Sequence, residues 1–188
     1  AADAGMLEDE TYYWLWSKNL AHSYYDHPPM VAYWVAAGTA LFGDTNLGIR
    51  ALAICSGVVT ALATGRTAFN VSGSAKASVL AALWISVLPI TALMSFLALP
   101  DAPVVMFWAL AIWCLSELAK GRRGEWWLGV GLFCGLGLLS KYNTLFLGAG
   151  IVVWLIADAR FRFWLSNGWP WAGGMLAALI FAPVIFWN

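Results

Sequence analysis

The side chains best suited to chemistry in this 188-residue chain are carboxylates that stand beside aromatic residues or prolines. Glu8, Asp9 and Glu10 run together directly before an aromatic stretch that includes Tyr13. One such acid can cap a helix, because the N-terminus of a helix carries partial positive charge. A carboxylate beside aromatic rings can instead hold its proton more tightly and act as a general base. Capping needs only one acid, so the run of three leaves both interpretations open.

A second acid stands in a stiff turn, Tyr25-Asp26-His27-Pro28-Pro29. The two prolines restrict the backbone, so the turn presents the Asp26 and His27 side chains in a constrained geometry. These side chains suit a divalent metal ion or a phosphate group. The alternative is a hydrogen bond between Asp26 and His27 that caps the following helix.

Asp101 and Lys141 complete the set of candidates. Asp101 lies between Pro100 and Pro103 at the junction of two apolar stretches, where it is either an ordinary helix start or a site acid. Lys141 lies in a polar break within a long apolar run. It either extends to the membrane interface or supplies a point charge for an anionic phosphate.

The composition is that of a membrane protein. Hydrophobic residues make up 62% of the chain and charged residues 11%, less than half the roughly 25% of a soluble domain. The net charge is zero without any basic block, so nucleic acid is not expected as a partner. Cys55, Cys114 and Cys134 lie within apolar runs, which predicts small buried side chains rather than disulfides or a zinc site.

The hydropathy pattern predicts an all-α fold, a polytopic membrane bundle of about six transmembrane helices preceded by two short interfacial helices. A lysine in mid-membrane costs about 3 kcal/mol, so the run 126–157 should break at Lys141. Gly131, Gly135 and Gly137 should allow close helix packing. The whole chain, 1–188, is expected to be one transmembrane domain: residues 1–50 form an outer segment with helices near 10–22 and 29–42. The six apolar stretches lie near 51–69, 77–99, 103–119, 126–140, 142–158 and 169–187.

Alternation of these spans separates the charges. One set of loops has a net charge of +4, and the rule that Lys and Arg stay on the cytoplasmic side places it inside. Its basic residues are Arg66, Lys76, Lys120, Arg122, Arg123, Arg160 and Arg162. The other set has a net charge of −4 and is expected on the periplasmic or luminal side. Its acids are Asp3, Glu8, Asp9, Glu10, Asp26, Asp44 and Asp101.

Several motifs in order resemble one enzyme family: 9–14 (DETYYW), 25–30 (YDHPPM), 42–50, 99–103 (LPDAP) and 137–143 (GLLSKYN). Together they resemble the dolichyl-phosphate-mannose–protein mannosyltransferases, especially the bacterial branch that includes the aminoarabinose transferases of lipid A. These are integral-membrane glycosyltransferases of the GT-C fold. The resemblance covers most of the chain, from about residue 9 to 188. It implies a polyprenyl-phosphate-linked sugar donor, with inverting transfer on the outer face of a membrane, the bacterial inner membrane for this branch.

The resemblance also implies roles for single residues. Asp9 matches the acid taken as catalytic base, with Glu10 its neighbour in the Asp-Glu pair, and Asp101 matches the acid of the second outer loop. Asp9, Glu10 and Asp101 thus form the expected catalytic set. Asp26 matches an acid that binds a metal ion in the aminoarabinose transferases, and Lys141 matches a basic residue that would contact the donor. His27 stands where those transferases have lysine. With Tyr25 and Lys141 it forms the expected substrate-binding set. We expect Asp9, Asp26, Asp101 and Lys141 to converge in a single cleft at the extracytoplasmic boundary.

The expected reaction needs no bound nucleotide, because the donor arrives already activated. Either a divalent metal ion on Asp26 or the side chains of His27 and Lys141 would balance the leaving phosphate, and the acceptor would be a lipid, a protein or a glycan. A transporter or flippase of lipid-linked sugars is the alternative, and a structural subunit is a third interpretation. The family's first span, later spans and C-terminal outer domain lie outside this sequence. We therefore expect a piece of a longer enzyme, inactive alone.

Overall fold

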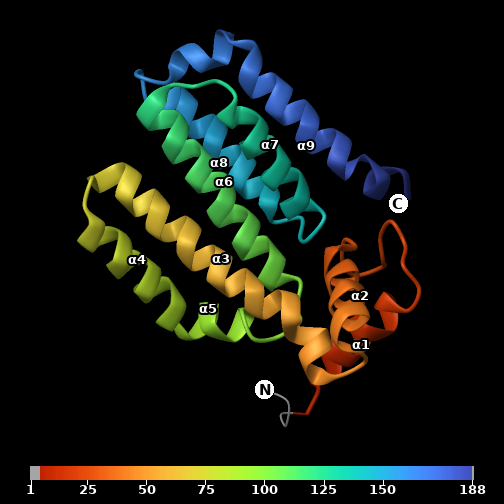
Figure 1. The fold of residues 1–188 in the computed structure, drawn as a ribbon. Helices are drawn as coiled ribbons and strands as arrows, with labels where there is room; N and C mark the ends of the chain where they lie inside the picture. The colour runs from red at the N-terminus through yellow and green to blue at the C-terminus, as the bar shows by residue number, and fades with distance from the viewer. Residues whose placement is uncertain (1–4, 188) are drawn as a thin grey trace.

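The computed structural model describes residues 5–187, and that part of the chain is helical without any strand. Asp3, one of the predicted outer acids, lies outside the described residues. The predicted all-α fold is confirmed (Figure 1). In chain order the elements are α1 (Glu8–Ser17), α2 (Met30–Phe42), α3 (Asn46–Ser72), α4 (Ala75–Val87), α5 (Pro89–Met94), α6 (Asp101–Gly121), α7 (Trp126–Leu138), α8 (Thr144–Ala157), the 3-10 helix η1 (Arg162–Ser166) and α9 (Gly168–Trp187).

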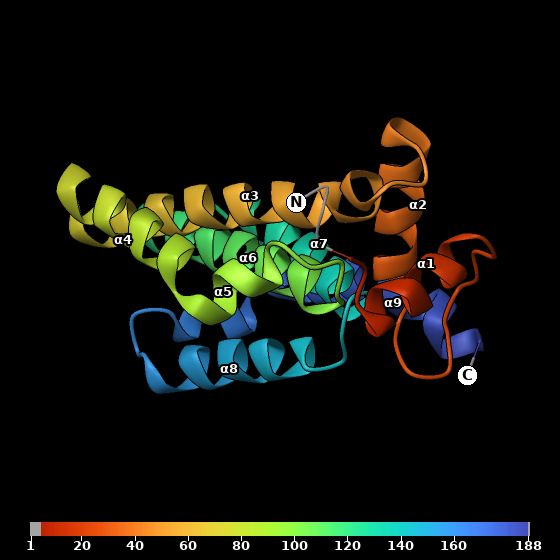
Figure 2. The same ribbon diagram turned by 90° about the horizontal axis from the view of Figure 1, so that it is seen from below.

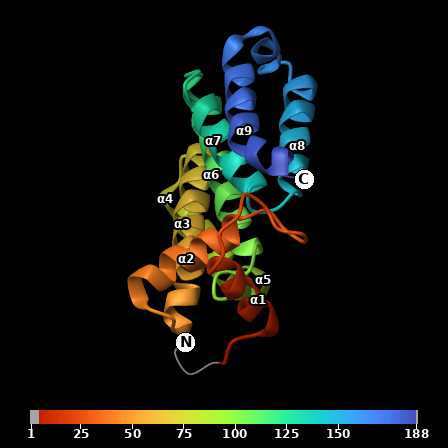
Figure 3. The ribbon, with the colours of Figure 1, turned by 90° about the vertical axis from the view of Figure 1, so that its right-hand side faces the viewer.

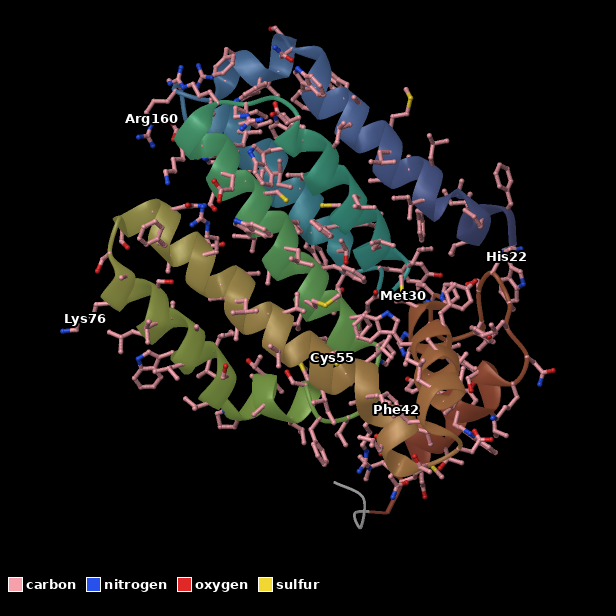
Figure 4. The ribbon with its side chains drawn as sticks, viewed as in Figure 1. His22, Met30, Phe42, Cys55, Lys76 and Arg160 are labelled. Carbon is pink, nitrogen blue, oxygen red and sulfur yellow. The ribbon has the colours of Figure 1, made fainter. Side chains whose placement is uncertain are left out.

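The helices from α3 onward run back and forth between two ends of a bundle. The segments 95–100 and 139–143 lie at the end that also carries α1 and α2, at the lower right of Figure 1. We call this the site end. The connections 73–74, 122–125 and 158–167 lie at the opposite end. Figure 4 shows the same division in single residues, with Lys76 and Arg160 far from Met30 and His22. The alternation inferred from the charges is therefore present in the fold.

Helix α3 packs between α4 and α6, and α6 continues the layer to α7 and α9. Helix α8 lies on the side of α6 away from α3 (Figures 2 and 3). The main apolar core forms where α6, α7, α8 and η1 meet, and it contains Cys114, Leu118, Trp127, Val130, Leu155, Phe161 and Trp164. Cys114 is buried as expected, but Cys55 is exposed on the surface of α3, so the expectation of burial was wrong for Cys55.

Close helix packing at glycines is confirmed. A methyl group added to Gly131 would lie 2.1 Å from the carbonyl oxygen of Gly173, so α7 and α9 touch backbone to backbone there. One added to Gly135 would lie 2.9 Å from Ile180 of α9. At Gly137 it would lie 2.9 Å from the Thr144 side chain at the start of α8.

The predicted spans differ in length. Within the described residues, three helices are long and apolar enough to cross a membrane: α3, α6 and α9. Helices α4, α7 and α8 have 13, 13 and 14 residues. At ~1.5 Å per residue they rise only about 20 Å, against a hydrocarbon core of ~30 Å. The stretch 77–99, predicted as one span, is broken between α4 and α5. Leu88 is extended (ψ 124°) because the residue before a proline avoids helical geometry, and Pro89 begins the next helix.

Two short helices precede α3, as predicted. Helix α1 starts at Glu8 and ends at Ser17, earlier than the expected His22, while α2 agrees closely with the predicted 29–42. Gly43 ends α2 with a positive φ of 71°, which glycine adopts without strain. Figure 2 shows α2 running across the end of the bundle, transverse to α3. A helix that lies along a membrane surface requires this direction.

Candidate active site

Four segments from distant parts of the sequence meet at the site end. Asp9 and Tyr13 stand one turn apart on α1, so both side chains face the same side of that helix. The His27 ring, from the proline turn, lies 6.2 Å from the Tyr13 ring between centroids. Asp101 is the first residue of α6, and Lys141 Nζ donates a hydrogen bond of 2.8 Å to its Oδ1.

The charged side chains of these segments also act on the same two residues, Tyr13 and His27, which supports their placement in one site. Burial, and then the fields of Asp9, Asp101 and Asp26, raise the pKa of Tyr13 to about 12. Burial, followed by the charge of Lys141, lowers the pKa of His27, although the three carboxylates oppose that shift. Tyr13 is therefore protonated and His27 largely uncharged at pH 7. The convergence of Asp9, Asp26, Asp101 and Lys141 that the sequence led us to expect is present in the structure.

Tyr13 is the residue that the sequence reasoning missed. Its side chain is 6% exposed and packs against Trp16 and Val31, beside the acids of the site. Its spacing of four residues from Asp9 was the available signal, because residues four apart on a helix share a face. A protonated hydroxyl there can donate a hydrogen bond but cannot serve as a base at neutral pH.

Asp26 and Tyr25 lie at the edge of the site. Asp26 is exposed, and its Oδ2 accepts a hydrogen bond of 2.8 Å from the hydroxyl of Tyr12 on α1. Helix α2 has no side-chain cap, so the structure does not support the interpretation of the Asp26 and His27 pair as its cap. Tyr25 is 95% exposed, so its predicted contact with substrate needs a ligand at the rim of the site.

Glu10 does not face the other acids. It is fully buried, and its carboxylate accepts hydrogen bonds from Arg50 Nε (2.7 Å), Ala98 N (3.1 Å) and Leu7 N (3.2 Å). The contact with Leu7 N caps the start of α1, so the capping interpretation is confirmed for Glu10. A carboxylate enclosed by these donors has no path to a substrate. The catalytic role assigned to Glu10 from the sequence is therefore corrected to a structural one.

The turn that carries Lys141 is held from two sides. The backbone N–H of Met30, at the start of α2, donates to the carbonyl of Leu139 at 2.9 Å. The Trp108 indole N–H, from α6, donates to Thr144 Oγ1 at 3.1 Å. These bonds connect the proline turn, α6 and the α7–α8 turn. Lys141, with its side chain 33% exposed, therefore contacts a fixed partner instead of extending freely to the interface.

An apolar groove reaches the same turn. Helices α7, α8 and α9 line a cavity of about 360 Å³ whose walls are almost entirely hydrocarbon. Leu138 and Thr144 border the groove and flank the α7–α8 turn, so the groove and Lys141 share one boundary. At its far end the groove is bordered by Trp127 and Trp171.

The fold and the site together define the class: an integral membrane protein of bundled helices whose carboxylates and lysine collect at one end. The chain belongs to the dolichyl-phosphate-mannose-protein mannosyltransferase family, whose model matches residues 26–187. This confirms the resemblance seen in the sequence motifs.

Curated relatives carry related names. The chain is 33% identical over 183 residues to the lipid A galacturonosyltransferase RgtD of Rhizobium johnstonii, covering 96% of the chain and 38% of that protein. It is 31% identical over 169 residues to the undecaprenyl phosphate-alpha-4-amino-4-deoxy-L-arabinose arabinosyl transferase of Erwinia tasmaniensis, covering 85% of the chain and 30% of that protein. It is 29% identical over 187 residues to the polyprenol-phosphate-mannose–protein mannosyltransferase of Mycolicibacterium smegmatis, covering 85% and 36%. The chain thus spans between 30% and 38% of the length of these relatives. No solved structure shows a significant match.

Proposed function

We propose that this chain forms part of a membrane glycosyltransferase that moves a sugar from a polyprenyl-phosphate donor to an acceptor at the extracytoplasmic face, with inversion. The observation that carries the proposal is the meeting of three carboxylates, a lysine and the mouth of an apolar groove at one end of the bundle. The names of two relatives include undecaprenyl phosphate and polyprenol-phosphate-mannose, and a third is named a lipid A galacturonosyltransferase.

Asp9 is the proposed general base. It is exposed at the site and its field acts on both Tyr13 and His27. It would take the proton of an acceptor hydroxyl, whose oxygen then bonds to the anomeric carbon while the bond from that carbon to the phosphate oxygen breaks. Attack opposite to the leaving phosphate inverts the anomeric centre.

The leaving polyprenyl phosphate needs positive charge and hydrogen-bond donors. Lys141 supplies a charge next to Asp101, and the protonated Tyr13 hydroxyl supplies a neutral donor. His27, largely uncharged at pH 7, adds an imidazole but little positive charge. The groove that ends beside Lys141 suits the hydrocarbon chain of such a donor, because its walls offer almost no polar group.

A divalent metal ion on Asp26 remains a proposal. Among residues 5–187 there is no group of three or more His, Cys, Asp and Glu side chains arranged to hold a metal ion. Asp26 offers one exposed carboxylate, so further ligands would have to come from the donor phosphate or from water.

The test uses the full-length protein that contains this chain, reconstituted in vesicles with labelled polyprenyl-phosphate sugars carrying mannose, galacturonic acid or 4-amino-4-deoxyarabinose. The wild-type protein should transfer one of these to an acceptor. Asp9→Asn should abolish transfer while donor binding remains. Glu8→Gln, a change at the neighbouring exposed acid, is the control and should retain transfer. Transfer retained in Asp9→Asn would rule out the base, and movement of intact donor across the vesicle without transfer would favour the transporter. Chelation with EDTA in the same assay tests the metal ion.

A further inference from the structure

A buried ion pair joins the segments that carry the acids of the site. Glu10 is 0% and Arg50 1% exposed, and Arg50 has the largest side chain among the fully buried residues of the described chain. The Arg50 guanidinium bonds to both Glu10 oxygens, through Nε and Nη2, and Nη2 also donates to the Gly5 carbonyl at 3.1 Å. The pair thus connects the start of α3 to α1 and to the residues before it.

The same carboxylate holds the segment that leads into α6. Glu10 Oε1 accepts from Ala98 N across 88 residues of sequence, and Ala98 stands three residues before Asp101. The Arg50 guanidinium also lies 5.0 Å from the centroid of the Phe96 ring in that segment. Figure 1 shows α1, the start of α3 and the segment before α6 meeting at the site end.

Helix geometry makes Glu10 decisive for the direction of Asp9. Successive residues of a helix point about 100° apart, so a side chain fixed on the inner face sets the rotation of the whole short helix. With Glu10 held inside, the side chains of Asp9 and Tyr13 face the proline turn at residues 25–29. Helix α1 has only ten residues and lacks the length to be stable alone, so its rotation depends on such contacts.

We propose that the Glu10–Arg50 pair is a positioning device for sugar transfer, which sets Asp9 on α1 against Asp101 on α6 without touching the substrate. The inference rests on the proposed function, because it assigns Asp9 and Asp101 to the reaction. It adds Arg50, which the sequence analysis included in the motif 42–50 without giving it a role. Burial alone would raise the pKa of Glu10, but the bonds from Arg50, Ala98 and Leu7 outweigh it and keep the carboxylate ionised.

The experiment compares two variants of the full-length protein. Glu10→Gln keeps the shape and removes the charge, and Arg50→Lys keeps the charge and removes the two-pronged contact. A displacement of about 1 Å at a catalytic group can cost ~100-fold in rate. We therefore expect kcat to fall 10- to 100-fold in both variants, while the donor Kd changes less than about twofold.

The control is a second ion pair, which begins directly after α1. Lys18 and Asp44 form an exposed pair at the same end of the bundle, so Lys18→Gln should leave kcat and the donor Kd unchanged. Hydrogen exchange at residues 95–100 gives a readout that needs no activity, since the uncharged amide oxygen of Gln accepts the N–H of Ala98 more weakly than the Glu10 carboxylate does.

Two results would overturn the positioning role. One is a folded Glu10→Gln or Arg50→Lys protein with wild-type kcat and unchanged exchange at 95–100. The other is failure of both variants to fold, because the pair would then serve folding alone. If the wild-type protein transfers no sugar but the variants still speed exchange at 95–100, the proposed function fails while the structural link stands.

Discussion

The backbone contact between α7 and α9 makes Gly173 sensitive to a single methyl group. A Cβ at Gly173 would lie 2.3 Å from the Trp127 carbonyl oxygen, whereas ordinary contacts begin at 3.4 Å. Helix α9 must therefore withdraw by about 1 Å, and overpacking of this kind costs about 1–3 kcal/mol. Alanine recovers up to ~1 kcal/mol through its better helix propensity. The net loss for Gly173→Ala is therefore up to about 2 kcal/mol, a factor of up to about 30 in the folding equilibrium.

The neighbouring residue is the matched control. A methyl group added at Gly174 would meet no atom within 4 Å, so Gly174→Ala should gain only the propensity term and leave stability equal or higher. Thermal unfolding of the chain 1–188 in detergent micelles measures both. Equal Tm values for the two variants, or a Gly174→Ala protein less stable than Gly173→Ala, would refute this reasoning.

Two further predictions concern charge at the site. Lys141→Gln should raise the KM for the donor about tenfold. Two unit charges at 4 Å attract each other by ~4 kcal/mol at an effective dielectric constant of 20. Partial exposure of Lys141, together with the release of Asp101, reduces the loss of binding energy to ~1–1.5 kcal/mol. An unchanged KM, with Lys18→Gln as the reference, would mean that Lys141 does not meet the phosphate. His27 has a lowered pKa in the folded protein, so the unfolded chain binds its proton more readily and stability should fall as the pH drops below 6.5. His27→Gln should flatten that part of a Tm-against-pH curve, and identical curves would contradict the assignment.

The alternation of spans could be predicted because lipid forces it. Lys141 cannot stay in the middle of an apolar run, so the break at residues 139–143 followed from one side chain, and the structure confirms it. The break at Leu88 was missed, although Pro89 was visible, because the surrounding run is apolar throughout. The end of α1 at Ser17 depends on packing against α2, which local sequence does not reveal.

The site residues that belong to sequence motifs could be predicted. The roles that depend on contacts between distant parts of the chain could not. Asp9, Asp26, Asp101 and Lys141 were identified as separate motifs, and their convergence followed from the shared end of the spans. Glu10 was misassigned because its partner Arg50 is 40 residues away in the sequence. Its other distant donor is the backbone N–H of Ala98, which the residue type at position 98 does not indicate. Only the folded chain separates two adjacent acids into one that is exposed at the site and one that is enclosed.

The bond from the Met30 N–H to the Leu139 carbonyl involves only main-chain atoms. This bond between the proline turn and the lysine turn therefore does not depend on the chemical identity of either side chain. An alanine scan would leave the bond itself intact, since alanine keeps both the N–H and the carbonyl. Proline is the one natural residue without a backbone N–H. A proline at position 30 would therefore remove this bond between the two turns without altering any charged group.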